Sequence, residues 1–303
     1  MFKDIQDARE RLAGQGYITG QEIATVLFLA QQLDKPILVE GPAGVGKTDL
    51  GKVAAAALDR EFIRLQCYEG LDESKALYEW EYSKQLLYTQ IMKDVLAKEM
   101  SGASSLTEAM ERVAGQDEVF FSRKFILARP LLRAILSERP AVLLIDEVDK
   151  SDPEFEAFLL EVLSDFQVSI PEIGTLAARH IPLVILTSNN AREMTDALKR
   201  RCLHLYIDFP GREQELEIVH LKVPGISEKL SAQVVEAVHR IRALDLKKAP
   251  GISETLDWAR SLVVLNAEQL DPALARSTLN VILKYEKDIS KARDNLAKIV
   301  EAP

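Results

Sequence analysis

One segment of eight residues constrains the fold of this chain more than any other. It reads G-x-x-x-x-G-K-T, it follows the apolar run 36–39, and it precedes residues 49–58, which favour a helix. In a strand–loop–helix context, glycines let backbone N–H groups turn around phosphates, and the helix N-terminus adds positive potential. The pattern predicts a phosphate-binding Walker A loop made of Gly41, Pro42, Ala43, Gly44, Val45, Gly46, Lys47 and Thr48.

Four side chains of the predicted site bring chemistry. The Lys47 ammonium can reach the β- and γ-phosphates of ATP, and the Thr48 hydroxyl can ligate Mg²⁺. A second apolar run, 141–145, ends in Asp146 and Glu147. Two acids can simply mark a strand that exits to solvent, but beside a complete Walker A loop they favour a Walker B element. There Asp146 would hold Mg²⁺ through water, and Glu147 would polarise an attacking water as a general base.

Size and charge narrow the class of protein. The chain has 303 residues, room for one large and one smaller domain, and a net charge of −9, which argues against a dedicated nucleic-acid surface. Its two cysteines, Cys67 and Cys202, fit a reducing compartment better than a disulfide framework. The charged N-terminus lacks the apolar core of a signal peptide, and no apolar run is long enough for a membrane span. We therefore expect a cytoplasmic protein.

The order of apolar runs predicts the architecture. Short runs rich in Ile, Leu and Val alternate with helical stretches, which is typical of a doubly wound parallel α/β sheet over residues 1–209. Few strand signals follow, so residues 210–303 are expected to form an all-helical second domain. The predicted strands are 35–40, 62–66, 141–146, 181–188 and 203–209, and the predicted helices of the second domain are 212–220, 227–244, 252–265, 273–285 and 288–300.

Two insertions interrupt the α/β pattern. Residues 66–125 form a long connection with helical character at 83–98 and 106–113. It holds several aromatic residues that could line a partner surface or pack onto the domain, among them Tyr68, Tyr78, Trp80, Tyr82 and Tyr88. The second insertion, 166–180, has two short apolar runs around Gly174 and predicts a hairpin.

Together these motifs resemble an AAA+ ATPase, a P-loop NTPase with a helical lid domain. In that family a polar residue after the next strand contacts the attacking water or γ-phosphate, and Asn189 matches it best, with Asn190 second. The helix 196–202 resembles the one that carries an arginine finger into the neighbouring subunit's site. Arg201 fits the finger best, and Arg200 is the alternative.

Within AAA+, the chain is similar to the MoxR family. Residues 38–41, both insertions and the detached lid carry this resemblance, and residues 68–72 and 76–80 resemble the branch associated with maturation of carbon monoxide dehydrogenase. The resemblance implies a ring oligomer, a hexamer, that works with a von Willebrand A-domain adaptor. Its ATP hydrolysis would remodel a client metalloenzyme or assist insertion of the client's metal cofactor.

One departure from the family concerns the lid. Many MoxR proteins carry a sensor 2 arginine at the start of the third lid helix, but residues 251–258 contain none, and Arg260 lies one turn further on. Two other functions remain open. An AAA+ nucleic-acid motor or loader would share the same core, although the acidic balance disfavours it. A small-molecule kinase is disfavoured by Glu147 and by the two arginines.

Overall fold

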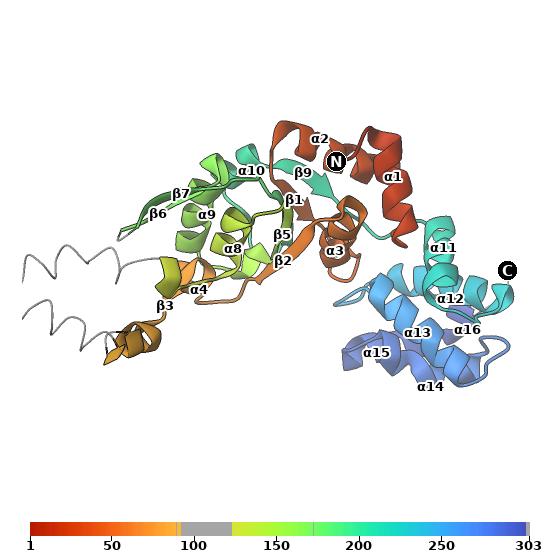
Figure 1. The fold of residues 1–303 in the computed structure, drawn as a ribbon. Helices are drawn as coiled ribbons and strands as arrows, with labels where there is room; N and C mark the ends of the chain where they lie inside the picture. The colour runs from red at the N-terminus through yellow and green to blue at the C-terminus, as the bar shows by residue number, and fades with distance from the viewer. Residues whose placement is uncertain (89, 92–122, 172, 301–303) are drawn as a thin grey trace, which may run out of the picture.

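The computed structural model describes residues 1–88, 90–91, 123–171 and 173–300. Its central feature is a sheet of five parallel strands in the order β2, β5, β8, β1 and β9 (Figure 1). This confirms the predicted doubly wound α/β fold. The strands, in that spatial order, are Glu61–Gln66, Ala141–Asp146, Leu183–Ser188, Ile37–Glu40 and Leu203–Tyr206.

Parallel pairing brings the carboxyl ends of the strands to one edge. Glu40 at the end of β1 lies opposite Ser188 of β8, and Gln66 of β2 lies opposite Asp146 of β5. Strand β9 ends at Tyr206 rather than at the predicted residue 209. Ile207 still donates its N–H to the Glu40 carbonyl at 2.8 Å, but β1 ends at Glu40, so the residues after Ile207 have no strand to pair with on that side.

Helices cover both faces of the sheet, because alternate strand residues point to opposite sides. Ile37 and Val39 pack with the helices of one layer, whereas Leu38 between them packs with the other. The first layer contains α1 (Ile5–Gly14), α2 (Gln21–Leu33) and α3 (Lys47–Leu58). The second contains α8 (Pro130–Leu136), α9 (Pro153–Asp165) and α10 (Asp196–Arg201).

The first insertion forms α4 (Glu73–Ala76) and a small antiparallel ladder of β3 (Tyr78–Trp80) with β4 (Ile126–Ala128). The sequence did not predict this ladder, because three-residue strands leave no periodic signal. Residues 82–88 and 90–91 are helical and overlap the predicted helix 83–98, whereas residues 92–98 and the predicted helix 106–113 lie outside the described residues. Tyr78 and Trp80 stack edge to face, and Tyr68, Tyr82 and Tyr88 are exposed.

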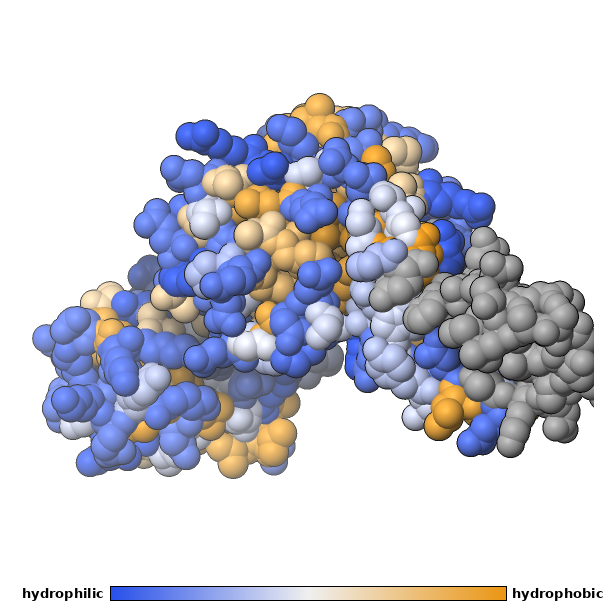
Figure 2. All heavy atoms as spheres, turned by 90° about the vertical axis from the view of Figure 1, so that its left-hand side faces the viewer, coloured by the Kyte–Doolittle hydropathy of each residue, from blue (hydrophilic) through white to orange (hydrophobic). Residues whose placement is uncertain are grey.

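The second insertion is the predicted hairpin, formed by β6 (Gln167–Ile170) and β7 (Gly174–Ala177). Its second strand starts at Gly174, earlier than the apolar run suggested. Figure 2 shows the side of the molecule that faces left in Figure 1, and most side chains on it are hydrophilic around an apolar area near the centre.

The remaining described residues form a helical layer below the α/β part in Figure 1. These helices enclose a core of their own around Trp258, which is fully buried and donates its indole N–H to Thr278 at 2.8 Å. The predicted last helix is two helices, because the chain breaks its helical geometry at Asn295. The helices are α11 (Arg212–Lys222), α12 (Glu228–Arg242), α13 (Ile252–Val264), α14 (Pro272–Ile282), α15 (Glu286–Asp294) and α16 (Leu296–Val300).

Across the described ranges, no helix has both the length and the apolar character that crossing a membrane requires.

Candidate active site

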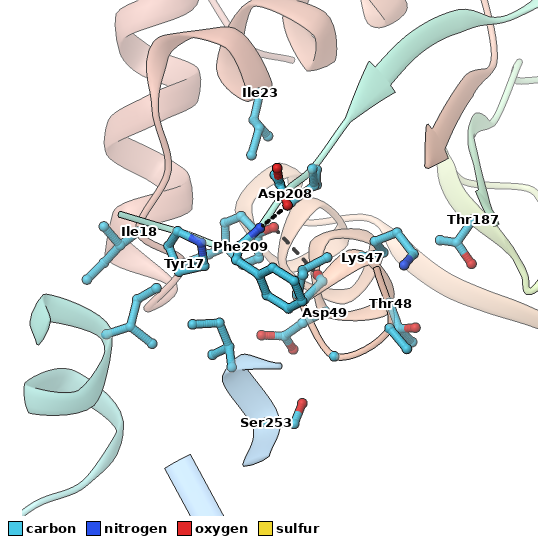
Figure 3. Close-up of a pocket in the computed structure, with 18 of the residues that line it drawn as sticks. Tyr17, Ile18, Ile23, Lys47, Thr48, Asp49, Thr187, Asp208, Phe209 and Ser253 are labelled. Carbon is cyan, nitrogen blue, oxygen red and sulfur yellow. Dashed lines mark hydrogen bonds between the residues drawn. The ribbon is translucent and has the colours of Figure 1, made fainter. Parts of the chain in front are cut away.

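The Walker A loop connects β1 to α3 and opens into a hollow of about 750 Å³ (Figure 3). Lys47, the first residue of α3, is only 5% exposed, and its ammonium donates to the carbonyl oxygens of Gly41 at 2.7 Å and Pro42 at 2.6 Å. Burial lowers the pKa of Lys47 to about 8, although the negative charges of Asp149 and Asp146 act to raise it. The lysine is therefore held inside the loop that the motif predicted, facing the hollow.

Gly41 shows why this loop begins with a glycine. Its φ of 144° lies in a region that residues with a Cβ rarely adopt, and a Cβ added there would lie 2.0 Å from the carbonyl oxygen of Ile207. Gly46 has a φ of 95° and caps the N-terminus of α3. The loop can thus turn sharply from strand to helix, and a turn of this kind can present backbone N–H groups to an anion.

Asp146, at the end of β5, is buried beside three donors. It accepts from the Thr48 hydroxyl at 2.9 Å, from the Thr187 hydroxyl at 2.5 Å and from the Arg64 guanidinium at 2.5 Å. Sequence reasoning missed Thr187 and Arg64. The signal for Arg64 was its alternation with Gln66 along β2, which pairs with β5 residue by residue.

The oxygens of Thr48 and Asp146 fit Mg²⁺, a hard cation that takes few protein ligands and completes its shell with phosphates and water. Among the described residues, no group of three or more His, Cys, Asp or Glu side chains could hold a metal ion. A site with one hydroxyl and one carboxylate therefore suits a metal that arrives with a nucleotide. The Arg64 guanidinium on Asp146 shows that this carboxylate already attracts a cation.

Glu147 follows Asp146 in a left-handed conformation, with φ of 57°, and its N–H donates to Thr187. Its carboxylate is held on both oxygens. Oε1 accepts from the Asn189 amide at 3.2 Å, and Oε2 accepts from Gln66 at 2.8 Å and from Lys150 at 2.6 Å. Gln66 and Lys150 were not predicted from the sequence.

The structure separates the two asparagine candidates. Asn189 lines the hollow and contacts Glu147, whereas Asn190 turns away in a left-handed conformation and interacts with Ser188. Buried Asp149 supports the loop, because its Oδ2 accepts the N–H groups of Asn189 at 3.1 Å and Ala191 at 2.9 Å. Sequence reasoning missed Asp149, although it stands only two residues after Glu147.

The two predicted finger residues lie apart from this hollow. Arg200 and Arg201 end α10, both are exposed, and neither lines the hollow of its own chain. Arg201 donates from Nε to the Ser164 hydroxyl at 2.7 Å. In the described part of the chain, neither arginine forms an ion pair. A role at a neighbouring subunit's site stays a prediction.

The helical layer forms the other wall of the hollow, which Ile252, Ser253 and Leu256 of α13 line. Ile18, before α2, and Phe209, after β9, lie around the same hollow (Figure 3). Arg260, the residue considered for sensor 2, lies in a separate hollow between α13 and α14 and pairs with Asp257 at 3.4 Å. The described structure thus does not bring Arg260 to the nucleotide side of the lid.

The chain is similar in sequence to several known proteins. Among curated relatives, the gas vesicle ATPase GvpN from Haloferax mediterranei is 25% identical over 69% of this chain and 56% of its own length. The chaperone protein ClpB 2 from Parasynechococcus marenigrum is 30% identical over 50% of this chain and 13% of its own length. The chain therefore spans less than two thirds of either relative. A point mutant of RuvB from Thermotoga maritima aligns with 98% of this chain and 77% of its own, at 16% identity and a TM-score of 0.49.

The family model that matches is the AAA domain of the dynein-related subfamily, over residues 36–202. The matched segment begins just before the Walker A strand, includes Asp146 and Glu147, and ends after the arginines of α10. Because it covers more than half of the 303 residues, the chain belongs to this AAA domain family.

Proposed function

We propose that this protein is a MoxR-type AAA+ chaperone that uses ATP hydrolysis to remodel a client metalloenzyme or to assist insertion of its metal cofactor. One observation carries the ATPase part: a lysine, a hydroxyl, two acids and an amide from three separate segments meet at one hollow. The relative named as a chaperone supports an action on other proteins, and the relative named as a gas vesicle ATPase supports ATP hydrolysis.

Nucleotide binding is assigned to the start of α3. Lys47 is held by two loop carbonyls, so it would exchange these neutral partners for the β- and γ-phosphates at little conformational cost. The Thr48 hydroxyl and the Asp146 carboxylate lie 2.9 Å apart and would hold Mg²⁺, Asp146 through water. The metal would supply positive charge that offsets the charge of the phosphates.

Hydrolysis is assigned to Glu147 and Asn189. Glu147 would take a proton from water, and the Asn189 amide would orient that water beside it. In the structure, both oxygens of Glu147 are engaged by Asn189, Gln66 and Lys150. Oε1 accepts only from Asn189 among the described residues, so it keeps a lone pair that could take the proton of a water, while Gln66 and Lys150 hold Oε2.

Completion of the site is assigned to a second copy of the chain. Arg201, or Arg200 as the alternative, is exposed on α10 and outside its own hollow, so a head-to-tail ring would carry it to a neighbour's γ-phosphate. We propose a hexameric ring. Within each copy, residues 1–209 would form the ATPase domain and residues 210–303 the lid.

The partners follow from the MoxR resemblance. We propose a von Willebrand A-domain adaptor, a cytoplasmic location and a client of the carbon monoxide dehydrogenase class. Steady-state ATPase measurements test this proposal, because addition of the metal-free client with its adaptor should raise the rate. Stimulation by DNA alone, with no response to client and adaptor, would favour a nucleic-acid motor instead.

The nucleotide site has a test of its own. Lys47→Ala should bind ATP far more weakly than the wild type, measured by titration with a fluorescent ATP analogue. Lys35→Ala is the matched control, since Lys35 is exposed and outside the hollow. Unchanged affinity in Lys47→Ala would overturn the assignment of the loop.

A further inference from the structure

A fully buried carboxylate lies at the centre of the helical layer. Glu215 of α11 is 0% exposed, and the guanidinium of Arg242 on α12 grips it with two hydrogen bonds of 2.6 and 2.8 Å. The Thr255 hydroxyl of α13 donates to the same carboxylate at 2.7 Å, and His239 Nε2 lies 2.9 Å from it. One acid thus joins three helices of the layer.

Arg242 also reaches two segments that border the nucleotide hollow. Its Nε donates to the carbonyl of Pro250 at 2.8 Å, just before α13 begins. Its guanidinium carbon lies 4.7 Å from the centre of the Phe209 ring, a cation–π contact. Phe209 lines the hollow beside the Walker A residues (Figure 3). The side chain of Arg242 is only 8% exposed, so its position is set by these partners.

The turn that Arg242 holds rests directly on the Walker A loop. The N–H of Ser253 donates to the carbonyl of Gly44 at 3.3 Å. A Cβ built on Gly251 would lie 2.8 Å from the Gly44 Cα and from the carbonyl oxygen of Ala43. Gly251 has a φ of −85°, which any residue adopts, so the absence of a side chain here serves close approach rather than an unusual backbone.

These contacts form one continuous path from the lid core to the phosphate-binding loop. We propose that Glu215 and Arg242 are positioning residues for the ATPase reaction: they hold Gly251 on the Walker A loop and Phe209 in the wall of the hollow. A buried ion pair is weak support for stability as such, so its value here would lie in fixing a geometry. The lid then senses nucleotide through backbone contact at Gly44, in a chain whose residues 251–258 contain no arginine.

This inference rests on the proposed ATP site, and Gly251→Ala tests it most directly. The alanine fits the backbone of the lid but collides with the Walker A loop, so it should separate the two without unfolding either. We expect unfolding without nucleotide to stay cooperative, at a somewhat lower melting temperature because the contact is lost, and the Kd for ATP to rise about tenfold, a usual size for a coupling between sites. Gly14→Ala is the matched control, because a Cβ there meets nothing within 4 Å.

A double variant tests the ion pair. Glu215→Leu with Arg242→Met removes both charges together, which avoids an unpaired buried charge. It should melt cooperatively, and its KM for ATP should rise about tenfold while kcat changes little, as expected when uniform binding is lost. Arg240→Met on the same helix is the control; Arg240 pairs with Glu236 at 2.7 Å and does not line the hollow.

The outcomes separate cleanly. Wild-type Kd and KM in a folded double variant and in Gly251→Ala would overturn the positioning role. If the double variant fails to fold, Gly251→Ala alone decides the question. Failure of the ATP site itself would show differently, as normal ATP binding by Lys47→Ala.

Discussion

Glu156 is a buried acid on which the start of α10 depends, and Glu156→Gln is the variant that tests this dependence. Its side chain is 1% exposed. One oxygen accepts the N–H of Thr195 at 2.8 Å and also the Thr195 hydroxyl, and the other accepts from Arg192 at 2.8 Å. Thr195 is the N-cap of α10, the helix that ends in the two candidate finger arginines.

The contacts set the size of the effect. Glutamine keeps the volume of the side chain and one acceptor, but it leaves Arg192 without its charge partner. Loss of one member of a buried pair costs about 3–5 kcal/mol. Arg192 is 27% exposed and can turn partly to water, so we expect the lower end, about 3 kcal/mol. For the α/β part this corresponds to a melting temperature lower by roughly 6–12 °C.

Urea and thermal unfolding followed by circular dichroism measure this loss. Glu154→Gln, two residues earlier on the same helix and exposed, is the control and should change stability by less than about 0.5 kcal/mol. Adding Arg192→Met to Glu156→Gln should recover part of the loss, because the unpaired charge is then gone. A Glu156→Gln protein as stable as its control would refute the reasoning.

The pH dependence gives a second check on Glu156. Burial raises its pKa, but the hydrogen bonds from Thr195 and Arg192 outweigh burial and leave the pKa below the ordinary value of 4.5. A lowered folded pKa contributes stability that is present above 4.5 and lost as the pH falls through the folded value. The difference in free energy of unfolding between the wild type and Glu156→Gln should therefore be constant near neutral pH and become smaller below pH 4.5.

Three further predictions concern the nucleotide reaction. Glu147→Gln should bind ATP and release phosphate about 10²–10⁴ times more slowly, and normal turnover would show that another residue activates the water. Arg201→Ala should bind ATP normally and lose about 10³–10⁵ in rate, and mixing it with Lys47→Ala should restore part of the activity if Arg201 acts on a neighbour. No recovery in verified mixed oligomers would mean that Arg201 acts within its own chain or only structurally. Arg260→Ala should leave the Kd for ATP unchanged, because Arg260 lies in a separate hollow; weaker binding would mean that the lid brings it to the nucleotide.

The sheet and its two motifs were predictable because their signals are local. An apolar run followed by a glycine-rich loop marks β1 and the Walker A turn, and a run that ends in Asp146 and Glu147 marks β5. Parallel pairing then brings the carboxyl ends to one edge whatever the intervening loops do. The helical layer was predictable for a related reason, since α13 begins at the predicted residue, directly after a proline and a glycine.

The partners of these motifs were not predictable, because they come from distant segments. Arg64 reaches Asp146 across 82 positions of sequence, and Thr187 reaches it across 41. Nothing local to Arg64 says whether it faces solvent or the site; that depends on the register of β2 against β5. Alternation along a strand shows which residues share a face of the sheet. Only the pairing of β2 with β5 shows which other side chains lie on that face.

The lid illustrates a different limit of sequence reasoning. The start of α13 has no arginine, which suggests a lid uncoupled from the nucleotide. In the structure the same position holds Gly251, and the missing side chain lets the backbone of α13 touch Gly44 of the Walker A loop. Because any shift of that loop on binding phosphate meets α13 without an intervening flexible side chain, the contact transmits small displacements directly into a packed core. The absence of a side chain at Gly251 is therefore the feature that permits the contact. The variant Gly251→Ala tests whether close backbone contact alone can couple a lid to its nucleotide.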